Sequence, residues 1–350
     1  MTQKMYNKSI MKTIFIINPK AGKGKGLGAL RERIAAAAAA CGQEAGVYLT
    51  KGVGDAESFA RAAAAEYGGR GEELHLIACG GDGTINEVVN GVLGAAGPIG
   101  KAGTAGAAGL TEAAGLTGAA GTAVGAIPIG TGNDFLRNFP KAGDFLDIGA
   151  QLEAAPVFID LLKYSGELDG RSAERYCVNM FNIGFDSNVA DLTARLKRYP
   201  LLSGSLAYLA AVVGMLVKKK GANLRIELDG EEVYAGPLLL TALANGCYCG
   251  GGIKSSPRAL PDDGIMDVNI IYDVSRREFV SKFPAYTRGT HLELEDIDRL
   301  LYFSQCSRAK ITPLCGSMRL CVDGEIMDAG PISIEVVPQA LRFLLPPGKE

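Results

Sequence analysis

A glycine-rich segment, GGDGTINE at residues 80–87, combines residue types that bind phosphate groups. Glycine lets the backbone adopt positive φ angles and approach an anion closely. An apolar run precedes the segment and apolar residues follow at helical spacing, which predicts a strand before it and a helix after it. Because a helix start offers N–H groups and a partial positive charge, we predict a phosphate cradle. The alternative is that Thr84 and Glu87 form only a capping box on a tight turn.

Two further loops have a related composition. The segment IPIGTGNDF at 127–135 follows an apolar run with two glycines, a hydroxyl and polar residues. Alone it is equally an ordinary turn capped by Asn133 or Asp134, but beside the first loop at the carboxyl edge of a parallel sheet it would complete a nucleotide pocket. The loop NPKAGKGKG at 18–26 contains three lysines and three glycines. It matches neither the dinucleotide-binding nor the P-loop spacing, and its alternative is a solvated basic loop.

Carboxylates in the second half of the chain are candidates for cation binding and proton transfer. Asp262, Asp263 and Asp267 surround a glycine, and such hard oxygen ligands suit Mg²⁺ or Ca²⁺, although the same pattern is typical of a plain Asp-Gly hairpin. Asp323-Gly324 is likewise an ordinary hairpin signal. Transfer of a γ-phosphoryl group to an alcohol needs positioning, a divalent cation and one carboxylate that accepts the proton.

The composition excludes several other classes. The 36 Lys and Arg residues against 38 Asp and Glu give no global field that would attract nucleic acid, and two histidines are too few for multi-histidine zinc sites. Eight cysteines without CxxC spacing, and no secretory leader, predict reduced thiols in a cytosolic protein. The longest apolar run, 201–217, falls short of the roughly 20 residues of a spanning helix, so we expect no transmembrane segment.

Taken together, NPKAG at 18–22, GGDGTINEVVNG at 80–91 and PIGTGNDF at 128–135 resemble the diacylglycerol kinase catalytic-domain family, in particular its soluble bacterial lipid kinases. The likeness covers nearly the whole chain, because further family-like stretches follow in order. These are ID at 159–160, NIGFD at 182–186, GSLAYL at 204–209, PRALPDDG at 257–264 and VDGE at 322–325.

The resemblance implies roles for particular residues. It implies that Asp263 binds a structural Mg²⁺ with the carbonyls of Leu260 and Ile265, and that Asp160 is linked to the ion through water. It also implies that Asp323 or Glu325 deprotonates the lipid hydroxyl, and we favour Asp323. The ATP site would be lined by Asn18, Pro19, Lys20, Ala21, Gly22, Thr50, Gly80, Gly81, Asp82, Gly83, Thr84, Ile85, Asn86 and Thr131, with Asn133 and Asp134 from the second loop.

The elements that must position these residues fall into two lobes. The first 140 residues alternate β-branched runs with alanine-rich helical patterns, which predicts a Rossmann-like α/β nucleotide-binding domain over 1–147, joined by the tail 336–350. Residues 148–335 predict an antiparallel, β-sandwich-like domain for the lipid and Mg²⁺. The expected strands are 13–17, 45–49, 74–79, 124–128, 157–163, 176–181, 224–228, 238–244, 266–272, 310–312, 318–322 and 332–337, and the expected helices are 27–41, 55–67, 84–93, 188–220 and 277–283.

One segment departs from the family pattern. Glycine recurs at about every third residue over Gly97 to Ala123, but with a single proline the segment is not collagen-like. We predict a flexible insertion that loops out without disturbing the pocket.

These features predict an ATP- and Mg²⁺-dependent kinase that phosphorylates a lipid hydroxyl, most simply diacylglycerol to phosphatidic acid in phospholipid metabolism. A polyprenol, a sphingoid base or phosphatidylglycerol is an alternative substrate. The rival enzyme is NAD kinase, which shares a GGDGT loop but not the GTGNDF and PRALPDDG stretches; the rival of another class is a non-catalytic nucleotide- or lipid-binding regulator.

The lipid substrate predicts where such a kinase works. We expect a cytoplasmic protein that associates peripherally with the membrane, where Arg195, Lys197, Arg198 and residues 218–220 would face anionic lipid; a solvated helix end is the alternative. A homodimer paired through an edge strand is a further expectation.

Overall fold

The computed structural model describes residues 12–24, 26–95, 121–184 and 221–348. Contacts within the chain group these residues into two compact units. The first contains the described residues up to Gly130, residues 141–158 and the residues from Leu341 onward; the second contains residues 131–140 and 159–340.

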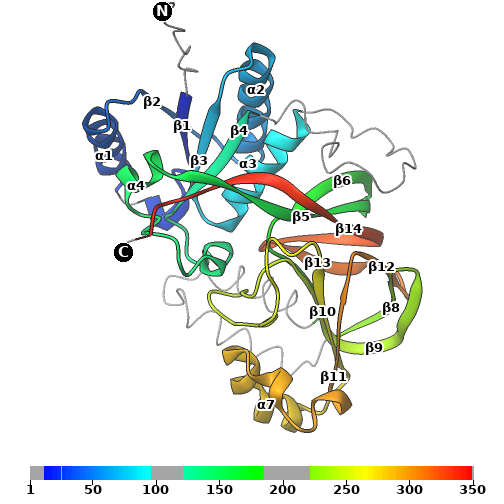
Figure 1. Cartoon of the computed structure of the whole chain (residues 1–350). Coiled ribbons are helices and arrows are strands. Elements are labelled where there is room, and N and C mark those ends of the chain that lie inside the picture. The colour runs from blue at the N-terminus through cyan, green and yellow to red at the C-terminus, as the bar shows by residue number, and fades with distance from the viewer. Residues whose placement is uncertain (1–11, 25, 96–120, 185–220, 349–350) are drawn as a thin grey trace, which may run out of the picture. The chain divides into compact units, whose positions relative to one another are not determined.

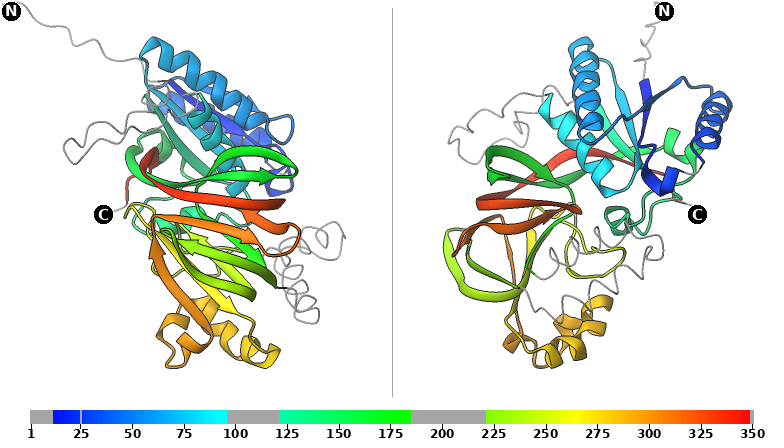
Figure 2. Two further views of the ribbon diagram at one scale, coloured as in Figure 1. Left: turned by 90° about the vertical axis from the view of Figure 1, so that its right-hand side faces the viewer. Right: turned by 180° about the vertical axis from the view of Figure 1, so that it is seen from behind.

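The first unit is a parallel sheet between helices (Figures 1 and 2). The strand order is β2-β1-β3-β4, and the end of β14 pairs parallel to β4 at Phe343 and Val124. All seven residues of β3 are buried, as expected for a strand covered on both faces. The bounds are β1 Lys12–Ile17, β2 Ala45–Leu49, β3 Leu74–Gly80, β4 Thr122–Pro128, α1 Leu27–Ala40, α2 Asp55–Arg70, α3 Asp82–Gly94 and α4 Ile148–Leu152, with a 3-10 turn at Ala21–Gly24.

Different helices cover the two faces of this sheet. Phe15, Ile17 and Ile77 pack with residues of α1 and α4 in one core cluster. On the other side α2 and α3 lie against each other so closely that a Cβ at Gly91 would come within 2.4 Å of the Glu57 carbonyl oxygen. The predicted α/β organisation of this region, with four strands and three helices, is confirmed. The expected insertion is corrected at one end, because Thr122 and Ala123 belong to β4; residues 96–120 lie outside the described residues.

The second unit is β-rich, as predicted. Its strand pairings close on themselves in the order β14-β13-β7-β9-β8-β12-β14, and β10 and β11 extend the sheet from β9. The interior of the ring is filled by a large apolar cluster that includes Tyr164, Phe181 and Leu320. The bounds are β5 Ala155–Leu168, β6 Arg171–Cys177, β7 Met180–Gly184, β8 Ala222–Leu228, β9 Glu231–Ala244, β10 Met266–Tyr272, β11 Leu301–Cys306, β12 Arg308–Pro313, β13 Met318–Val322 and β14 Glu325–Leu345.

One helix packs at the β10–β11 side of this unit (Figure 1). Helix α7 (Arg276–Arg288) begins with a complete capping box between Ser275 and Glu278 and ends at Gly289, whose φ is +76°. It is longer at both ends than the predicted 277–283. Two 3-10 turns, His291–Glu293 and Ile297–Arg299, lead from it to β11.

Several predicted elements of the second unit need correction. The expected strand 176–181 is two strands, because β6 ends at Cys177 and β7 begins at Met180. β11 was not predicted, and β14 extends well beyond 332–337. The expected helix 188–220, with the basic residues Arg195, Lys197, Arg198 and 218–220, lies outside the described residues.

Two smaller predictions bear on this fold. All eight cysteines are free thiols in this structure. Within the described ranges, no helix combines the length and apolar character needed to span a membrane.

Candidate active site

The carboxyl ends of the parallel strands gather the first set of predicted residues. Thr50, after β2, donates its N–H to the Ile17 carbonyl, and Asn18, after β1, donates its N–H to the Cys79 carbonyl, both at 2.9 Å. Beyond β4, the N–H groups of Ile129 and Gly130 both donate to the Gly80 carbonyl at 3.0 Å. We call residues 18–22, Thr50, 80–83 and 129–130 the nucleotide cradle. Its position at one sheet edge is where ligands bind in open α/β sheets.

The Asn18 side chain ties the first loop of the cradle to α3. Its Nδ2 donates to the Thr84 hydroxyl at 3.3 Å, and its Oδ1 accepts from the Lys20 N–H at 3.0 Å. Two constraints require glycine at position 22. Gly22 has a φ of +58°, and a Cβ there would lie 2.8 Å from the Ile129 carbonyl oxygen. The first and last loops of the cradle therefore meet backbone to backbone.

Helix α3 begins at the glycine pair of the predicted phosphate loop. The residue before the helix, Gly81, supplies no capping side chain, and a Cβ at Gly80 would come within 2.1 Å of the Thr84 hydroxyl. The capping-box interpretation is wrong, because Thr84 lies inside the helix and Glu87 instead accepts the Ala56 N–H, at the start of α2, at 3.2 Å. A helix start without a side-chain cap suits an anionic ligand.

Some predicted nucleotide-site residues point into the protein. Ile85 and Asn86 are each only 3% exposed, and the Asn86 Oδ1 accepts from the Asn90 Nδ2 at 3.0 Å. Any contact of these two residues with a nucleotide would therefore involve the backbone. Lys20 is exposed, whereas Thr50 is buried.

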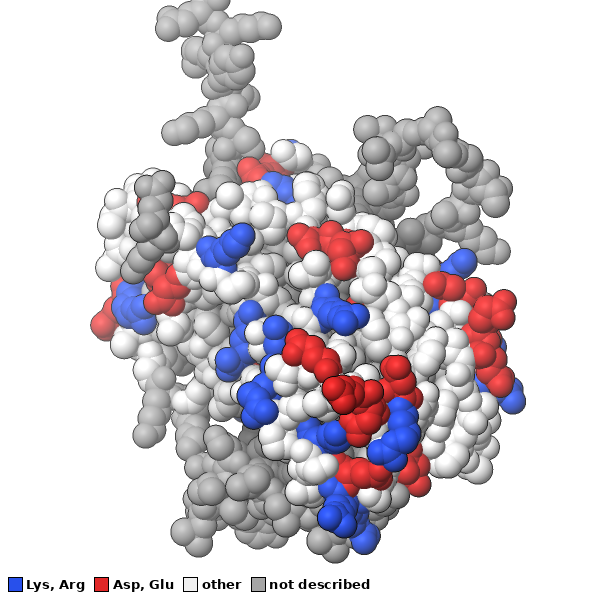
Figure 3. Space-filling model, turned by 60° about the horizontal axis from the view of Figure 1, so that its bottom comes forward, with Lys and Arg blue, Asp and Glu red and all other residues white. Residues whose placement is uncertain are grey.

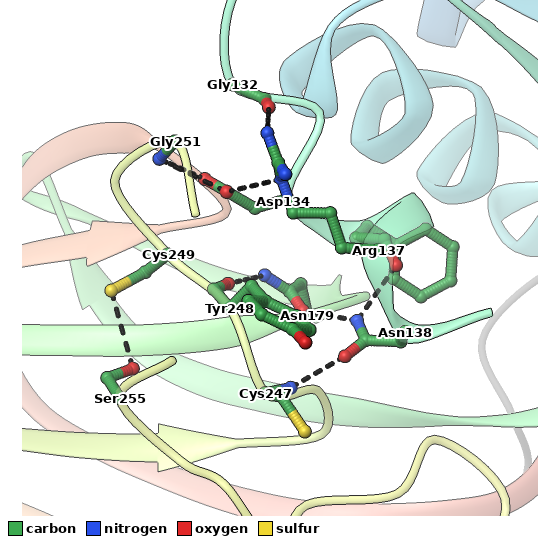
Figure 4. A network of polar contacts seen from close by, with 11 residues as sticks. Gly132, Asp134, Arg137, Asn138, Asn179, Cys247, Tyr248, Cys249, Gly251 and Ser255 are labelled. Carbon is green, nitrogen blue, oxygen red and sulfur yellow. Dashed lines mark hydrogen bonds and ion pairs between the residues drawn. The ribbon is translucent and has the colours of Figure 1, made fainter. Parts of the chain in front are cut away.

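The remaining predicted nucleotide residues, Thr131, Asn133 and Asp134, belong to the second unit. Asp134 is 7% exposed, and its carboxylate accepts the Gly251 N–H with both oxygens, at 2.8 and 3.1 Å (Figure 4). Burial raises the pKa of Asp134, while the amide donors and the Arg137 guanidinium oppose that rise. In this unit Asp134 braces the loop that contains Gly251.

A frame of amide side chains supports the same loop (Figure 4). Asn138 donates to the Asn179 Oδ1 at 3.2 Å and accepts the Cys247 N–H at 2.7 Å, while the Asn179 Nδ2 donates to the Tyr248 carbonyl at 2.8 Å. A Cβ at Gly246 would come within 2.4 Å of both asparagine side chains, so only glycine fits there. Sequence reasoning missed this frame; its only local signal is Asn138 at the end of the NDFLRN run.

The predicted catalytic turn is a hairpin between β13 and β14. Asp323 and Gly324 have φ values of +48° and +88°, as in the favoured two-residue hairpin turns. Asp323 is 6% exposed, and its carboxylate accepts the N–H groups of Val178, Asn179 and Met180 at 2.7, 2.9 and 3.1 Å. The Cys177 thiol also donates to it, at 3.2 Å.

These contacts explain why β6 and β7 are separate strands. The amide groups of residues 178–180 point to Asp323 rather than to a neighbouring strand, so the chain turns there. Together with the Cys177 thiol they hold the carboxylate in place, because Oδ1 accepts from Asn179, Met180 and the thiol while Oδ2 accepts from Val178. Glu325, which opens β14 opposite Val322, is half-buried. Both carboxylates lie near Tyr164, whose pKa is raised first by burial and further by nearby groups that include these acids.

Asp160 is the most heavily bonded of the predicted cation residues. It is 1% exposed, and its carboxylate accepts the Gly264 N–H at 2.6 Å and the Gln339 N–H at 2.7 Å. Its own N–H donates to the Pro261 carbonyl at 2.7 Å. Asp160 therefore fixes the turn 261–264 against β5 and β14.

The turn and the start of β10 offer carboxylate oxygens. Asp263 is exposed and accepts the Ile265 N–H at 3.2 Å, whereas Asp267 is 1% exposed. The Asp267 Oδ1 accepts from Gln305 at 2.9 Å, but its buried Oδ2 has no hydrogen-bond partner. Burial raises the pKa of Asp267 to about 6, with the charge of Asp263 adding to the effect.

The Asp267 Oδ2, which has no hydrogen-bond partner, and the nearby Asp263 carboxylate are oxygen ligands of the kind that a hard divalent cation prefers. Among the described residues no group of three or more Asp, Glu, His or Cys side chains could hold a metal ion; the predicted set uses one carboxylate and two carbonyl oxygens instead.

Known protein families match both halves of the chain. Residues 12–163 match the diacylglycerol kinase catalytic domain, and residues 179–345 match the YegS C-terminal NAD kinase beta sandwich-like domain. A curated diacylglycerol kinase of Mycobacterium tuberculosis is 30% identical over 230 residues, which cover 64% of this chain and 69% of that protein. The chain belongs to the diacylglycerol kinase catalytic-domain family.

Other members of the family extend the match along the chain. A "Probable lipid kinase YegS-like" of Xanthomonas euvesicatoria pv. vesicatoria is 30% identical over 329 residues, 91% of this chain and 90% of that protein. A solved diacylglycerol kinase structure from Bacillus anthracis str. Sterne superposes with a TM-score of 0.64 at 19% identity, covering 96% of this chain and 97% of that one. At that identity the superposition shows a shared fold.

The two family matches divide the candidate residues between them. The nucleotide cradle and Asp160 lie in the catalytic-domain match, whereas Asp263, Asp323 and Glu325 lie in the C-terminal match. The roles of these residues stay predictions.

Proposed function

We propose that this member of the diacylglycerol kinase family is an ATP-dependent lipid kinase, and that its substrate is most simply diacylglycerol, which it converts to phosphatidic acid. The observation that carries this proposal is the nucleotide cradle. Glycine stands at its close contacts, Gly22 against Ile129 and Gly80 against Thr84. The start of α3 has no side-chain cap at Gly81. The first unit would bind ATP, and the second would bind the lipid and a cation.

The chain's own residues suggest how transfer proceeds. N–H groups at the start of α3 would hold the phosphates, and Lys20 would add positive charge at the loop after β1. A bound Mg²⁺ would neutralise charge that develops on the transferred group. The lipid hydroxyl would lose its proton to a carboxylate of the Asp323–Glu325 turn.

The bonding of that turn favours Glu325 as the proton acceptor. Asp323 already accepts three N–H groups and a thiol, so we propose that it positions the turn and that Glu325 takes the proton. This reverses the preference drawn from the sequence.

Because its substrate is a lipid, we propose that the enzyme works in the cytoplasm at a membrane surface. A homodimer stays a prediction.

The substrate is tested by incubating the purified protein with γ-labelled ATP and separate vesicles or micelles of diacylglycerol, polyprenol, sphingoid base and phosphatidylglycerol, with NAD as a water-soluble acceptor. We expect label in phosphatidic acid. Label in NADP alone would identify a NAD kinase. Binding of ATP with no labelled product from any acceptor would indicate a regulator.

Cation binding is tested by thermal unfolding after EDTA treatment. At about ten times its Kd, Mg²⁺ should raise the unfolding free energy by about 1.4 kcal/mol. Asp263→Asn should remove this increment, because it removes the proposed ligand carboxylate. Asp298→Asn, a charge change in the 3-10 turn before β11, is the control and should keep it. An increment that persists in Asp263→Asn would place the ion elsewhere.

A further inference from the structure

The short segment between β6 and β7, residues 178–180, is bonded to the catalytic turn in both directions. Its three N–H groups donate to the Asp323 carboxylate, and the Asp323 N–H donates to the Met180 carbonyl at 3.2 Å. Glu325 lies two residues further along the same hairpin and pairs with Val322 across it. The position of Glu325 therefore depends on where the 178–180 segment lies.

Asn179 connects this segment to two other parts of the chain (Figure 4). It is 4% exposed, and its Nδ2 donates to the Tyr248 carbonyl at 2.8 Å while its carbonyl accepts the Asn245 N–H at 2.8 Å. Its Oδ1 accepts from the Asn138 Nδ2 at 3.2 Å. Because a buried polar group without a partner is costly, these partners together hold Asn179 in one orientation.

Asn138 links Asn179 to the segment that contains the predicted nucleotide residues. It is the last residue of a 3-10 turn that directly follows Asp134. Its Nδ2 donates to the Phe135 carbonyl at 2.8 Å as well as to Asn179, so the side chain is tied to its own turn. A continuous path of hydrogen bonds therefore runs from this segment through Asn138 and Asn179 to Asp323.

A second path leads from the same segment to the predicted cation residues. The Asn245 Nδ2 donates to the Val178 carbonyl and to the Asp160 carbonyl, both at 2.9 Å. The Asp160 carboxylate in turn accepts the Gly264 N–H in the cation turn. Within the second unit, the 178–180 segment is therefore bonded to the nucleotide segment, the catalytic turn and the cation turn.

We propose that Asn138 and Asn179 are positioning residues for phosphoryl transfer, through which the nucleotide segment orients the proton acceptor Glu325. This inference rests on the proposed lipid kinase function. Neither asparagine has to touch ATP or the lipid in this role. A displacement of about 1 Å at a catalytic group is enough to slow a reaction strongly, so the loss of one link should lower kcat and leave the binding of both substrates unchanged.

Asn138→Asp removes the link with little change in size. The new carboxylate can still accept the Cys247 N–H, but it can no longer donate to the Asn179 Oδ1. We expect kcat on the lipid to fall about tenfold, with the KM values for ATP and for the lipid within about twofold of wild type. An unchanged kcat would overturn the proposal.

The matched control is Asn223→Asp, the same substitution at an exposed position of β8. The surface already has acidic and basic residues interspersed around α7 (Figure 3), so one further surface charge should have little effect. Asn223→Asp should therefore keep the wild-type kcat.

A double-mutant cycle distinguishes positioning from a general loss of structure. In Glu325→Gln no proton acceptor is left to orient, so adding Asn138→Asp should lower the remaining kcat by less than about twofold. A purely structural role would lower kcat by the same factor in both backgrounds, and that result would overturn the proposal.

A further test needs no catalysis. Hydrogen exchange followed by mass spectrometry should show the amides of residues 178–180 exchanging about tenfold faster in Asn138→Asp, with unchanged exchange in β8 as evidence that the variant is folded. Faster exchange without phosphorylation of any lipid would support the hydrogen-bond path and remove the proposed function. Phosphorylation of lipid with unchanged exchange at 178–180 would remove the path alone.

Discussion

Glu325→Gln should lower kcat on the lipid substrate by about 10²- to 10⁴-fold, the usual contribution of a general base, with the melting temperature unchanged. The side chain is half-buried at the first position of β14, and glutamine keeps its size while removing its capacity to accept a proton. Steady-state kinetics with saturating ATP, together with thermal unfolding, would measure both quantities.

Asp323→Asn distinguishes the role of Asp323 from that of Glu325. Asparagine offers one acceptor oxygen to three converging N–H groups and turns its own NH₂ toward donors, so we expect a loss of about 1–3 kcal/mol of stability for each buried donor left unpaired. The variant should therefore melt earlier. If Asp323→Asn instead kept its melting temperature and lost activity, while Glu325→Gln stayed active, Asp323 would be the base.

Gly80→Ala should disable the nucleotide cradle. The new Cβ would lie 2.1 Å from the Thr84 hydroxyl, and Gly80 also accepts the N–H groups of Ile129 and Gly130, so a shift at this residue would move two loops. We expect a loss of about 1–3 kcal/mol of stability from overpacking, and at least a tenfold weaker affinity for ATP. Differential scanning calorimetry and competition with a fluorescent ATP analogue would measure the two effects.

A glycine without neighbours provides the matched control. No atom lies within 4 Å of a Cβ built on Gly28, in α1, so Gly28→Ala should keep ATP affinity and gain up to about 1 kcal/mol from helix propensity. Native affinity and stability in Gly80→Ala would mean that ATP does not bind at this sheet edge.

Local sequence patterns were sufficient to predict the strands and helices of the first unit. The β-branched runs, the alanine-rich helices and the glycine pair at the start of α3 each carry their signal within a few residues, and neighbouring parallel strands place their carboxyl ends at one edge. The gathering of Asn18, Thr50 and Gly80 followed from that rule. The burial of Asn86 did not follow from that rule. Its hydrogen bond with Asn90 depends on how the helix packs and not on a sequence pattern.

Long-range contacts decided the parts that sequence reasoning missed. The break between β6 and β7 depends on Asp323, which lies more than 140 residues further along the chain. The Asn138–Asn179 frame joins segments 41 residues apart. β11 lacks the alternation of a half-buried strand. No short motif encodes any of these.

The last strand has a consequence for experiments that divide this protein. Residues of β14 close the ring of the second unit, and further along the same strand Phe343 pairs with Val124 of the first. A fragment that stops at the end of the catalytic-domain match, near residue 163, would expose an edge of β4, because Phe343, which pairs with Val124, is encoded more than 200 positions after it. Such an edge invites aggregation. The two halves should therefore be produced as one polypeptide, or as fragments mixed and refolded together.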